Sequence, residues 1–413
     1  MVKRSFVSYQ SLTVKIVQQV KLIVLTSRFP FPLEKGDKLR AYHQIRELSR
    51  RYEITLVALS EQPVLAAHIT HLQTICQRVE VLLLPHWRLP GRLLRGLGRA
   101  YPLQVAYFFS PHIQRQIQQL ITEVQPDAVY CQLIRMAPYA EQVSGFKVLD
   151  YMDAFSAGMQ RRAAQSKSYL KWLFRWEAKR LQDYESAVFQ HFNHCSIISV
   201  QDRDLLAIAD KARIRIVPNG VDTLLFTNKT DRLPQYDLVF VGNMGYHPNV
   251  EAARWLVHEL LPVLHQNRPQ LRLLIAGARP TAAVQSLQNE RVTVAGWMDD
   301  IREAYSNARV FVAPIFLGSG QQNKILEAMS MQLPCITTPM VNNAIGAPVN
   351  KAILIASTAQ DFAQQVHLLL ENAKLRAQIG REARTFVEQK YSWQHSVSIL
   401  TELFDKNNAA NEF

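Results

Sequence analysis

The sequence has little cysteine, and its cysteines lie far apart. Among 413 residues there are four of them, Cys76, Cys131, Cys195 and Cys335. No two form a CxxC pair or stand at the spacing of a zinc site, and the twelve histidines are equally scattered. These absences exclude a disulfide-stabilised secreted domain and predict buried thiols in a reducing compartment.

Long apolar segments are also missing. No window of about 18 uninterrupted apolar residues occurs, and a helix that spans a bilayer needs such a window. The first residues, MVKRSFVSYQSLTVKIVQQVKL, include an early basic pair but lack the continuous apolar core and the cleavage site of a signal peptide. We therefore expect a cytoplasmic protein, with residues 1–20 as an N-terminal extension.

Acidic residues are scarce relative to basic ones. The 47 Lys and Arg residues outnumber the 34 Asp and Glu residues, which gives a formal net charge of +13. Such a charge suits nucleic acid, an anionic membrane face or phosphorylated small molecules as partners. With 48% apolar and 20% charged residues the composition is that of an ordinary globular protein, and 413 residues predict two domains.

Short β-like runs alternate with helical patterns along nearly the whole chain, which is typical of a doubly wound α/β fold. The first series contains a strand at 21–29, a helix at 39–52 and a strand at 52–60, and it continues through VEVLLLP, DAVYCQL, KVLDYMD and CSIISVQ. The second series begins with YDLVFVGNMG at 236–245. It continues through a helix for which Asn249 is the expected N-cap, then LRLLIAGA, VTVAGWM and RVFVAPIFLG. The two series predict two Rossmann-like domains.

The remaining segments complete this prediction. Residues 213–235 are rich in turn residues and are the expected linker, and a final helix is expected at about 378–405. In doubly wound sheets, ligands bind at the carboxyl ends of the strands. The loops to consider therefore lie on either side of a cleft between the domains, at 28–38, 243–249, 277–281 and 315–323.

The segment GSGQQNKILEAMSM, residues 318–331, is the most informative of these loops. Its glycines let backbone amides approach a ligand, and the helix that follows offers free N–H groups and a positive dipole end. Lys324 and Glu327 are three residues apart and lie along one edge of the first turns. Lys324 is then placed to neutralise a phosphate, and Glu327 to accept hydrogen bonds from sugar hydroxyls. The alternative is a surface helix with one Lys–Glu pair after a glycine turn.

A second glycine loop, PLEKGDKLR at 32–40, follows the first strand. Gly36 opens a turn, and Lys38 and Arg40 stand where a helix begins. Facing the other domain across the cleft, these cations complete an anion site. The alternative is a solvated basic loop.

A pair of acids, Asp150 and Asp153, lies at the end of the run KVLDYMD. Two carboxyl groups suit acid/base chemistry. In strand geometry, residues three apart point to opposite faces, so we expect only Asp153 to face the cleft.

Two basic stretches carry aromatic and apolar residues at helical spacing. HWRLPGRLLRGLGRAY places arginines at 88, 92, 95 and 99, and SKSYLKWLFRWEAKR places Lys or Arg at 167, 171, 175 and 179. Helices that are basic, aromatic and amphipathic together lie on anionic membrane surfaces. The alternative is ordinary packed helices with a basic solvent face.

Five stretches, taken in order, resemble one known family. They are FPFPLEKGDKLRAYHQIRELSRRYEI, LFRWEAKRLQDYE, IVPNGVDTLLF, GNMGYHPNVEAARWL and QQNKILEAMSMQLPCITTP, and together they run over most of residues 21–395. The chain resembles a family 4 glycosyltransferase of the GT-B fold, a retaining enzyme that uses a nucleotide sugar. More narrowly, it is similar to the sugar transferases associated with PEP-CTERM/exosortase exopolysaccharide loci.

The resemblance implies how the chain is divided. It implies an N-terminal acceptor-binding domain at 21–218 and a C-terminal nucleotide-sugar-binding domain at 219–385. A C-terminal helix at 386–413 is expected to pack back on the first domain. In the family, the second acid of a Glu-x7-Glu motif contacts the ribose of the donor. Glu327 matches that acid, and Ser319 stands where the first acid is expected.

The resemblance also implies where the diphosphate binds. The family tends to place an Arg and a Lys after the first strand of the second domain, but here that stretch reads GNMGYHPN, with Asn243 in place of the Arg and no Lys. We hypothesise that Lys324, with Lys38 or Arg40, supplies the missing positive charge. No cofactor is expected, because the nucleotide sugar is a substrate, and the family implies no metal.

The candidate residues fall into three groups. The candidate catalytic residues are Asp153 and Lys324. The candidate donor-binding residues are Gly242, Asn243, Gly318, Ser319, Gly320, Gln322, Asn323, Lys324 and Glu327. The candidate residues on the acceptor or phosphate side are Gly36, Lys38 and Arg40.

The sequence therefore predicts sugar transfer from a nucleotide-sugar donor to a glycan or a polyprenyl-diphosphate-linked acceptor, in exopolysaccharide or cell-surface polysaccharide biosynthesis. An anionic membrane surface at the inner face of the plasma membrane is a further expected partner. Two alternatives stay open, a nucleotide-sugar epimerase on the same fold and a non-catalytic sugar-nucleotide-binding protein. Nucleic-acid binding fits poorly because the basic stretches are split, and a dehydrogenase fits poorly because no GxGxxG follows the first strand.

Overall fold

A computed structural model describes most of the chain. The described residues are 19–85, 87, 89–97, 101–166, 168–228, 233–316 and 321–408. Several positions singled out in the sequence lie outside them, namely Gly318, Ser319, Gly320, Arg88, Arg99 and Lys167, and the side chain of Arg95 is likewise outside the description.

The first domain is built on a seven-stranded sheet in the order β3-β2-β1-β4-β5-β6-β7. Every pairing in it is parallel. Its strands are β1 (Lys21–Thr26), β2 (Glu53–Ser60), β3 (Arg78–Leu83), β4 (Ala128–Gln132), β5 (Phe146–Asp150), β6 (His194–Ile197) and β7 (Ile214–Ile216). The strand order reverses between β1 and β4, which is where a doubly wound sheet opens a crevice for a ligand.

The second domain repeats this plan with six parallel strands in the order β10-β9-β8-β11-β12-β13. They are β8 (Tyr236–Val241), β9 (Leu273–Ala276), β10 (Val292–Gly296), β11 (Ala308–Ala313), β12 (Cys335–Thr337) and β13 (Leu354–Ile355). The order reverses between β8 and β11, so the loops after these two strands border the second crevice. The prediction of two Rossmann-like domains is confirmed.

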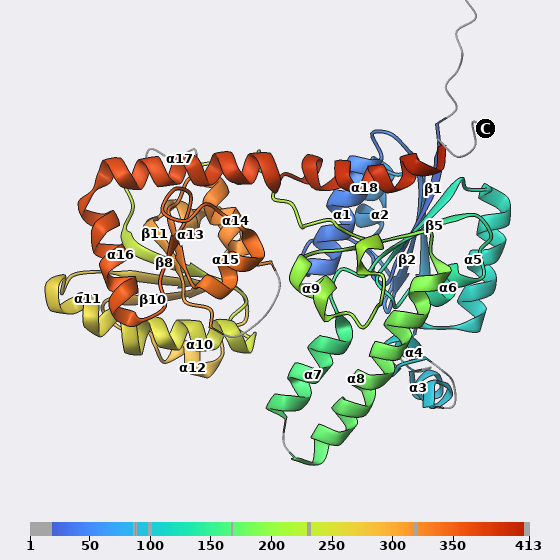
Figure 1. Cartoon of the computed structure of the whole chain (residues 1–413), viewed down its shortest axis with the longest axis horizontal. Helices are drawn as coiled ribbons and strands as arrows, with labels where there is room; N and C mark the ends of the chain where they lie inside the picture. The colour runs from blue at the N-terminus through green and yellow to red at the C-terminus, as the bar shows by residue number, and fades with distance from the viewer. Residues whose placement is uncertain are drawn as a thin grey trace, which may run out of the picture.

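Helices cover both faces of each sheet, and the two domains lie side by side (Figure 1). In the first domain they are α1 (Gly36–Leu48), α2 (Ala66–Gln73), α3 (Leu89–Leu97), α4 (Leu103–Phe108), α5 (Pro111–Val124), α6 (Ala137–Glu141), α7 (Phe155–Gln165), α8 (Ser168–Val188), η2 (Phe189–His191), α9 (Val200–Leu205) and η3 (Lys211–Arg213). In the second they are α10 (His247–Trp255), η4 (Leu256–Leu260), α11 (Leu261–Asn267), α12 (Ala282–Gln285), α13 (Arg302–Ser306), α14 (Asn323–Ser330), α15 (Pro339–Ile345), α16 (Ala359–Glu371) and α17 (Ala373–Lys390).

The last helix, α18 (Trp393–Asn408), crosses back from the second domain to the first (Figure 1). It packs on α1, and its residues Leu400, Leu403 and Phe404 belong to the same buried cluster as Ile45 and Leu48 of α1. The first domain therefore takes part of its core from the end of the chain.

The strands are buried because their runs of Val, Ile and Leu are covered on both faces, as in other all-parallel sheets. In β1, for example, Leu22, Ile23, Val24 and Leu25 are at most 1% exposed. Leu22 and Val24 join the cluster that includes α18, whereas Ile23 and Leu25 join the cluster on the opposite face. Alternate residues of one strand thus hold two helical layers.

The structure corrects the predicted linker and the predicted final helix. Part of 213–235 is not linker, because Ile214–Ile216 form β7 at the edge of the first sheet. The final helix is two helices, α17 and α18, separated at Tyr391 and Ser392. Val221 of the linker forms a β-bridge with Ser392 and donates its N–H to the Tyr391 carbonyl over 2.6 Å. The two segments that join the domains are therefore bonded to each other, which explains why the helix breaks there.

Candidate active site between the two domains

The loop after β8, GNMGYHPN, is held by close backbone packing. A Cβ on Gly277 would lie 1.9 Å from the carbonyl oxygen of Gly242, and Gly277 has a φ of +133°. Asn243 accepts the Gly245 N–H on its side-chain oxygen over 3.0 Å. Asn243 itself is exposed, at the carboxyl edge of the sheet where the sequence predicts the donor.

Asn249 is not the N-cap of α10, as the sequence predicted; Tyr246 takes that position. Asn249 is buried, and its Nδ2 donates to the Asn243 carbonyl over 2.9 Å. Its Oδ1 accepts a hydrogen bond from the Lys324 ammonium. Because Asn249 lies on α10 and Lys324 in the first turn of α14, this amide joins the two loops that border the crevice of the second domain.

Lys324 lies in an environment that disfavours its charge. It is partly buried, and its ammonium lies 5.2 Å from the centroid of the Phe240 ring. Burial lowers the pKa of Lys324 to about 7, and the nearby Glu327 carboxylate opposes this shift. The ammonium is therefore half neutral near pH 7, and a bound anion at this point favours its charged form.

Glu327 lies one turn further along α14 and is fixed by Tyr305. The Tyr305 hydroxyl, on α13, donates to a Glu327 carboxylate oxygen over 2.8 Å. Burial raises the pKa of Glu327, while this hydrogen bond and Lys324 oppose the rise. At the N-terminus of the same helix Gln322 makes no capping bond, and the side-chain oxygen of Asn323 is buried without a hydrogen-bond partner among the described residues. This end of α14 can still accept a ligand.

On the first domain, Gly36 begins α1, and Lys35 precedes it without a side-chain cap. Lys38 lines a cavity of about 340 Å³ together with Lys35, Arg28 and His68. Burial lowers the pKa of Lys38. Gly36 and Lys38 therefore lie where the sequence placed them, at the carboxyl end of β1.

Arg40 does not lie in that cavity, which corrects its assignment to the phosphate side. Its side chain is fully buried and ion-paired with Asp150, with Nε 2.6 Å from one carboxylate oxygen. The guanidinium also donates to the Val217 carbonyl and to Asn219 Oδ1, each over 2.9 Å. Arg40 cannot reach a diphosphate without breaking this network, so Lys38 is the remaining partner for Lys324 in our charge hypothesis.

Asp150 and Asp153 have separate environments, but not through strand geometry, because β5 ends at Asp150 and the intervening Met152 has a φ of +62°. Asp150 is fully buried and accepts hydrogen bonds from Tyr130 and Ser196 as well as from Arg40. Asp153 lines a cavity of about 370 Å³. Burial, together with the charge of the nearby Asp202, raises the pKa of Asp153 to about 6.

This cavity lies between the domains. Its walls on the first domain include Gln104, Arg161 and Arg162, and Tyr246 contributes from the loop after β8. The structure thus brings Asp153 together with a residue of the predicted donor loop. Sequence reasoning missed Tyr246, Asn249 and Gln104. The first two stand in the stretch GNMGYHPN that carries the resemblance, but Gln104 has no recognisable motif around it.

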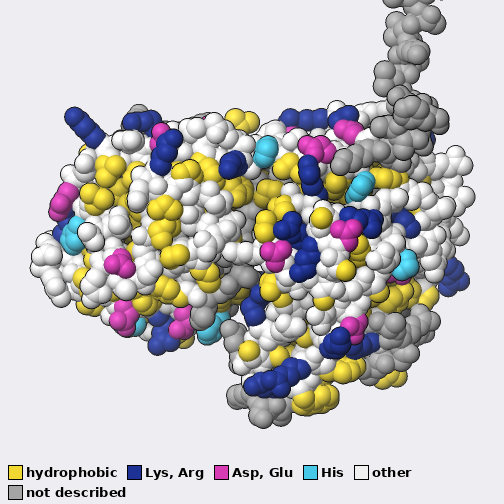
Figure 2. All heavy atoms as spheres, in the orientation of Figure 1, with side chains coloured by type: hydrophobic (Ala, Val, Ile, Leu, Met, Phe, Trp, Pro, Cys, Tyr) yellow, Lys and Arg dark blue, Asp and Glu magenta, His cyan; other side chains and the backbone are white. Residues whose placement is uncertain are grey.

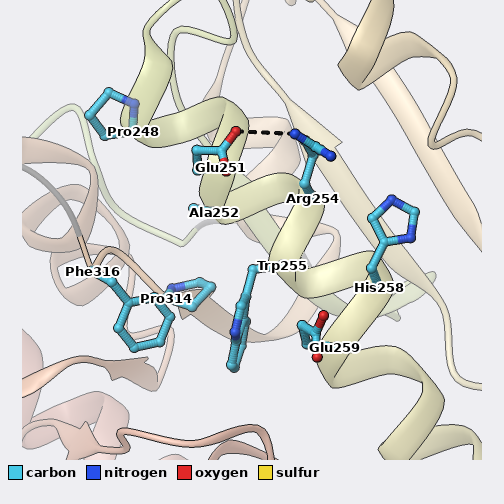
Figure 3. A pocket seen from close by; sticks show the side chains of 9 residues that line it. All are labelled: Pro248, Glu251, Ala252, Arg254, Trp255, His258, Glu259, Pro314 and Phe316. Carbon is cyan, nitrogen blue, oxygen red and sulfur yellow. Dashed lines mark hydrogen bonds and ion pairs between the residues drawn. The ribbon is translucent and has the colours of Figure 1, made fainter. Parts of the chain in front are cut away.

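A third cavity, of about 300 Å³, lies beside α10 and the π-helical turn η4 (Figure 3). Trp255 and Phe316 line it with their rings edge to face at 5.2 Å, and Trp255 contacts Phe362 of α16 at the same distance. Glu251 and Arg254 form an ion pair at its rim. Phe316 follows β11, so this aromatic cluster fixes the last described residue before the glycine loop.

Within the described ranges, no three His, Cys, Asp or Glu side chains are grouped as metal ligands. The helices described for this chain include none long and apolar enough to cross a bilayer.

The second domain matches a known family. Residues 235–372 match the family described as "Glycosyl transferases group 1". The matched range begins one residue before β8 and includes Asn243, Asn249, Lys324 and Glu327.

Two curated proteins are similar in sequence. An uncharacterized 44.6 kDa protein in the cps region of Klebsiella pneumoniae is 20% identical over 407 residues, which are 94% of this chain and 100% of that protein. The capsular polysaccharide biosynthesis glycosyltransferase CapM of Staphylococcus aureus is 34% identical over 110 residues, which are 26% of this chain and 28% of CapM. The stronger identity is thus confined to about a quarter of each chain.

Solved structures match over nearly the whole chain. Sucrose-phosphate synthase from Thermosynechococcus elongatus has a TM-score of 0.68 at 16% identity, covering 94% of this chain and 100% of that one. Anabaena HepE in complex with UDP has a TM-score of 0.65 at 14% identity, with 94% and 100% covered. At these identities the likeness shows the fold alone.

Fold and family together define the class of this protein, a glycosyltransferase enzyme of the GT-B fold. More particularly, residues 235–372 of its second domain match the group 1 glycosyl transferases, which confirms the resemblance to GT-B glycosyltransferases.

Proposed function

We propose that this protein is a retaining glycosyltransferase that moves a sugar from a nucleotide-sugar donor to a glycan or lipid-linked acceptor. One observation carries the proposal. Asp153 of the first domain and Tyr246 of the second line the same cavity. In this proposal the first domain contacts the acceptor and the second domain contacts the donor. A cavity lined by both domains is therefore where the two substrates can meet.

On the donor side, Glu327 accepts hydrogen bonds from the ribose and Lys324 neutralises the diphosphate. Both residues lie in the first turns of α14, and Tyr305 and Asn249 hold their side chains in place. Asn243 adds polar contacts from the facing loop. The structures of Anabaena HepE contain UDP and UDP-glucose, which makes UDP sugars the first donors to examine.

The leaving diphosphate and Lys324 act on each other. Negative charge near a buried ammonium favours its protonated form, which in turn stabilises the charge that develops as the sugar leaves. A lysine whose pKa is about 7 when the site is empty gains charge when the donor binds. Lys324 is thereby a catalytic residue in this proposal.

On the acceptor side, Asp153 is close enough to the donor loop to orient an acceptor hydroxyl or take its proton. Burial favours a pKa of about 6 for Asp153, so most of the group is carboxylate at pH 7. The family resemblance implies retention of configuration without an agreed protein nucleophile. It also implies that the donor phosphate helps to deprotonate the acceptor hydroxyl. Closure of the domains would exclude water, which otherwise hydrolyses the donor.

The pathway in this proposal is exopolysaccharide or cell-surface polysaccharide biosynthesis. CapM is named for capsular polysaccharide biosynthesis, and the Klebsiella relative is named for the cps region. The narrower similarity to PEP-CTERM/exosortase-associated transferases remains part of the proposal.

We also propose that the first domain docks on an anionic membrane at the inner face of the plasma membrane. Helices α7 and α8 form a hairpin that projects from the domain (Figure 1), and Trp172 near its tip is 66% exposed. Lys and Arg side chains lie beside hydrophobic ones at this end (Figure 2), where Arg175 is exposed. Arg92, which the sequence placed on the same basic surface, is only 6% exposed and does not belong to it.

One experiment tests the transferase proposal. Nucleoside diphosphates and nucleotide sugars are screened for thermal stabilisation of the full chain, and those that bind are incubated with and without polyprenyl-diphosphate-linked sugars. A transferase yields an elongated lipid only when donor and acceptor are both present. Conversion of the donor sugar without any acceptor would instead assign an epimerase.

A further inference from the structure

The largest cavity described on the first domain lies away from Asp153, at the carboxyl end of the edge strand β3. It has a volume of about 790 Å³ and is formed by the end of β3, by α3 and by the start of α5. Its described lining residues are Leu83, Leu84, Pro85, Trp87, Gly91, Arg92, Ser110, Pro111, His112, Ile113 and Arg115. The proposed transfer chemistry makes no use of it.

The polar lining of this cavity is one-sided in charge. It contains Arg92, His112 and Arg115, and none of its described lining residues is acidic. Arg92 is only 6% exposed, and its guanidinium lies 5.7 Å from the centroid of the Tyr107 ring. Arg115 is exposed and forms no ion pair within the described part of the chain. A pocket with such a lining attracts an anion.

The start of α5 adds to this preference. Ser110 makes no side-chain capping bond, and the first turn of the helix carries no acid. The N–H of Gln114 is the first to bond back, to the Ser110 carbonyl over 2.9 Å, so the amides of His112 and Ile113 precede the regular bonding. Both of these residues line the cavity. The basic side chains and the N-terminus of α5 both favour a negatively charged ligand here.

Two large apolar side chains of the lining are exposed to solvent, whereas Leu84 and Ile113 are buried. Trp87 is 73% exposed and Leu83 is 52% exposed, although both line a concave surface. Leu94, on the same helix α3 that carries Arg92, is also 73% exposed. A purely polar anion would leave the exposed apolar side chains of the cavity in contact with water. An anion that also carries an apolar group would cover them, so the lining fits an amphiphilic anion better.

The cavity adjoins the Lys38 cavity and is joined through α3 to the α7–α8 hairpin. Leu84 lines this cavity and also the neighbouring cavity that holds Lys38. Arg180 of α8 donates to the Gly96 carbonyl of α3 over 2.7 Å, which joins this region to the hairpin that carries Trp172. The cavity therefore neighbours the Lys38 cavity on the first domain and is connected, through α3, to the helix that carries Trp172.

We infer that this cavity binds the phosphate-bearing end of a prenyl lipid that carries the acceptor sugar. Arg92 and Arg115 contact the phosphate oxygens, and Trp87 and Leu83 pack against the first isoprene units. The inference rests on the proposed function and names the chemical class of its acceptor. A phosphate compound without a prenyl chain would make the contacts with the arginines but not those with Trp87 and Leu83.

The experiment is a calorimetric titration of the full chain with three probes, farnesyl diphosphate, inorganic pyrophosphate and farnesol. It is done with and without saturating UDP, whose own binding is measured first. Farnesyl diphosphate is expected to bind in the presence of UDP and to bind more tightly than either other probe. Displacement of farnesyl diphosphate by UDP would overturn the inference, because the probe would then occupy the donor site.

Two variants locate the binding. Arg115→Gln is expected to weaken farnesyl diphosphate about tenfold, since charge-assisted contacts to phosphate are strong, and to weaken pyrophosphate as well. Trp87→Ala is expected to weaken farnesyl diphosphate alone. The matched controls Arg381→Gln and Trp297→Ala change exposed residues of the second domain. Equal affinities for farnesyl diphosphate and pyrophosphate, or an affinity that ignores both cavity variants, overturn the inference while UDP binding still stands.

Discussion

The side-chain amide of Gln321 forms two hydrogen bonds with the backbone of Asn219. Its Nε2 donates to the Asn219 carbonyl over 2.8 Å, and its Oε1 accepts the Asn219 N–H over 3.0 Å. Asn219 lies in the linker, and its own side chain accepts a hydrogen bond from Arg40, which is ion-paired with Asp150. A continuous polar network thus runs from the residue before α14's N-cap to β5, three residues before Asp153.

The first prediction concerns this network. Gln321→Ala removes two hydrogen bonds, each worth about 1 kcal/mol, and leaves two backbone groups of Asn219 unpaired. We expect the two domains to sample a wider range of separations. Because the four cysteines are buried, spin labels at Gln119→Cys and Ala283→Cys can report one inter-domain distance by pulsed EPR.

The matched control is Gln322→Ala, whose side chain caps nothing. We expect its distance distribution to equal that of the parent. If Gln321→Ala leaves the distribution as narrow as the control does, the network does not hold the domains together, whatever its effect on stability.

The second prediction concerns Lys324 and pH. Its pKa is lowered to about 7 in the empty protein, and a bound diphosphate raises it again. Binding therefore takes up a proton above pH 7, and the affinity for UDP falls as pH rises from 7 to 9. For folding, the sign is opposite: the unfolded lysine keeps its proton up to about 10.4, so this residue alone makes stability rise with pH over the same window.

Lys324→Met is the test, because it keeps the length of the side chain and removes the charge. We expect UDP to bind at least about tenfold more weakly to this variant at pH 7, with little pH dependence above 7. Calorimetry in two buffers of different ionisation enthalpy would reveal the proton uptake in the parent. An unchanged affinity would refute the assignment of Lys324 to the diphosphate.

The third prediction concerns the ribose contact of Glu327. A carboxylate that accepts a bond from the 2′-hydroxyl distinguishes UDP from 2′-deoxy-UDP, by about 1–3 kcal/mol for a bond to a charged group. In Glu327→Gln we expect that difference to shrink, since the bond is no longer charge-assisted. The four affinities form a double-mutant cycle. A cycle with no coupling energy would mean that Glu327 does not contact this hydroxyl.

Much of the fold was predictable, and the reasons are local. Strands such as β1 and β8 are continuous runs of Val, Ile, Leu or Phe that only a buried parallel strand explains. β12 and β13 have three and two residues, too few for any pattern. The break between α17 and α18 depends on the bonding of Val221 to Tyr391, a contact between residues distant in sequence.

The candidate site divides in the same way. Lys324 and Glu327 could be proposed from the sequence because a single helix turn carries both. Gln321 and Asn249 form hydrogen bonds with residues distant in sequence, and no local sequence pattern predicts those partners. Arg40 was misplaced for an avoidable reason. It falls on the stripe of α1 that continues through Gln44 and Leu48, and that stripe is buried.

The fourth prediction concerns Asp153. If its carboxylate orients or deprotonates the acceptor, transfer requires the ionised form, and burial has raised its pKa to about 6. The rate at saturating substrates should then fall as pH drops below 6. Asp153→Asn is expected to lose about 10²–10⁴-fold in kcat while UDP affinity is retained, which separates catalysis from donor binding. A variant with parental kcat would exclude Asp153 from the chemistry.

The fifth prediction concerns membrane docking by the α7–α8 hairpin. Exposed Trp172 and Arg175 suit the interface of an anionic bilayer, where each basic residue contributes about 1 kcal/mol. In co-sedimentation with vesicles rich in phosphatidylglycerol at low salt, we expect Trp172→Ala with Arg175→Gln to lower the bound fraction severalfold. Trp297→Ala, a change of similar exposure on the second domain, should bind like the parent. Salt should weaken the parent's binding, since exposed charges are screened. Retention that ignores salt and the hairpin variants alike would place any membrane contact elsewhere on the protein.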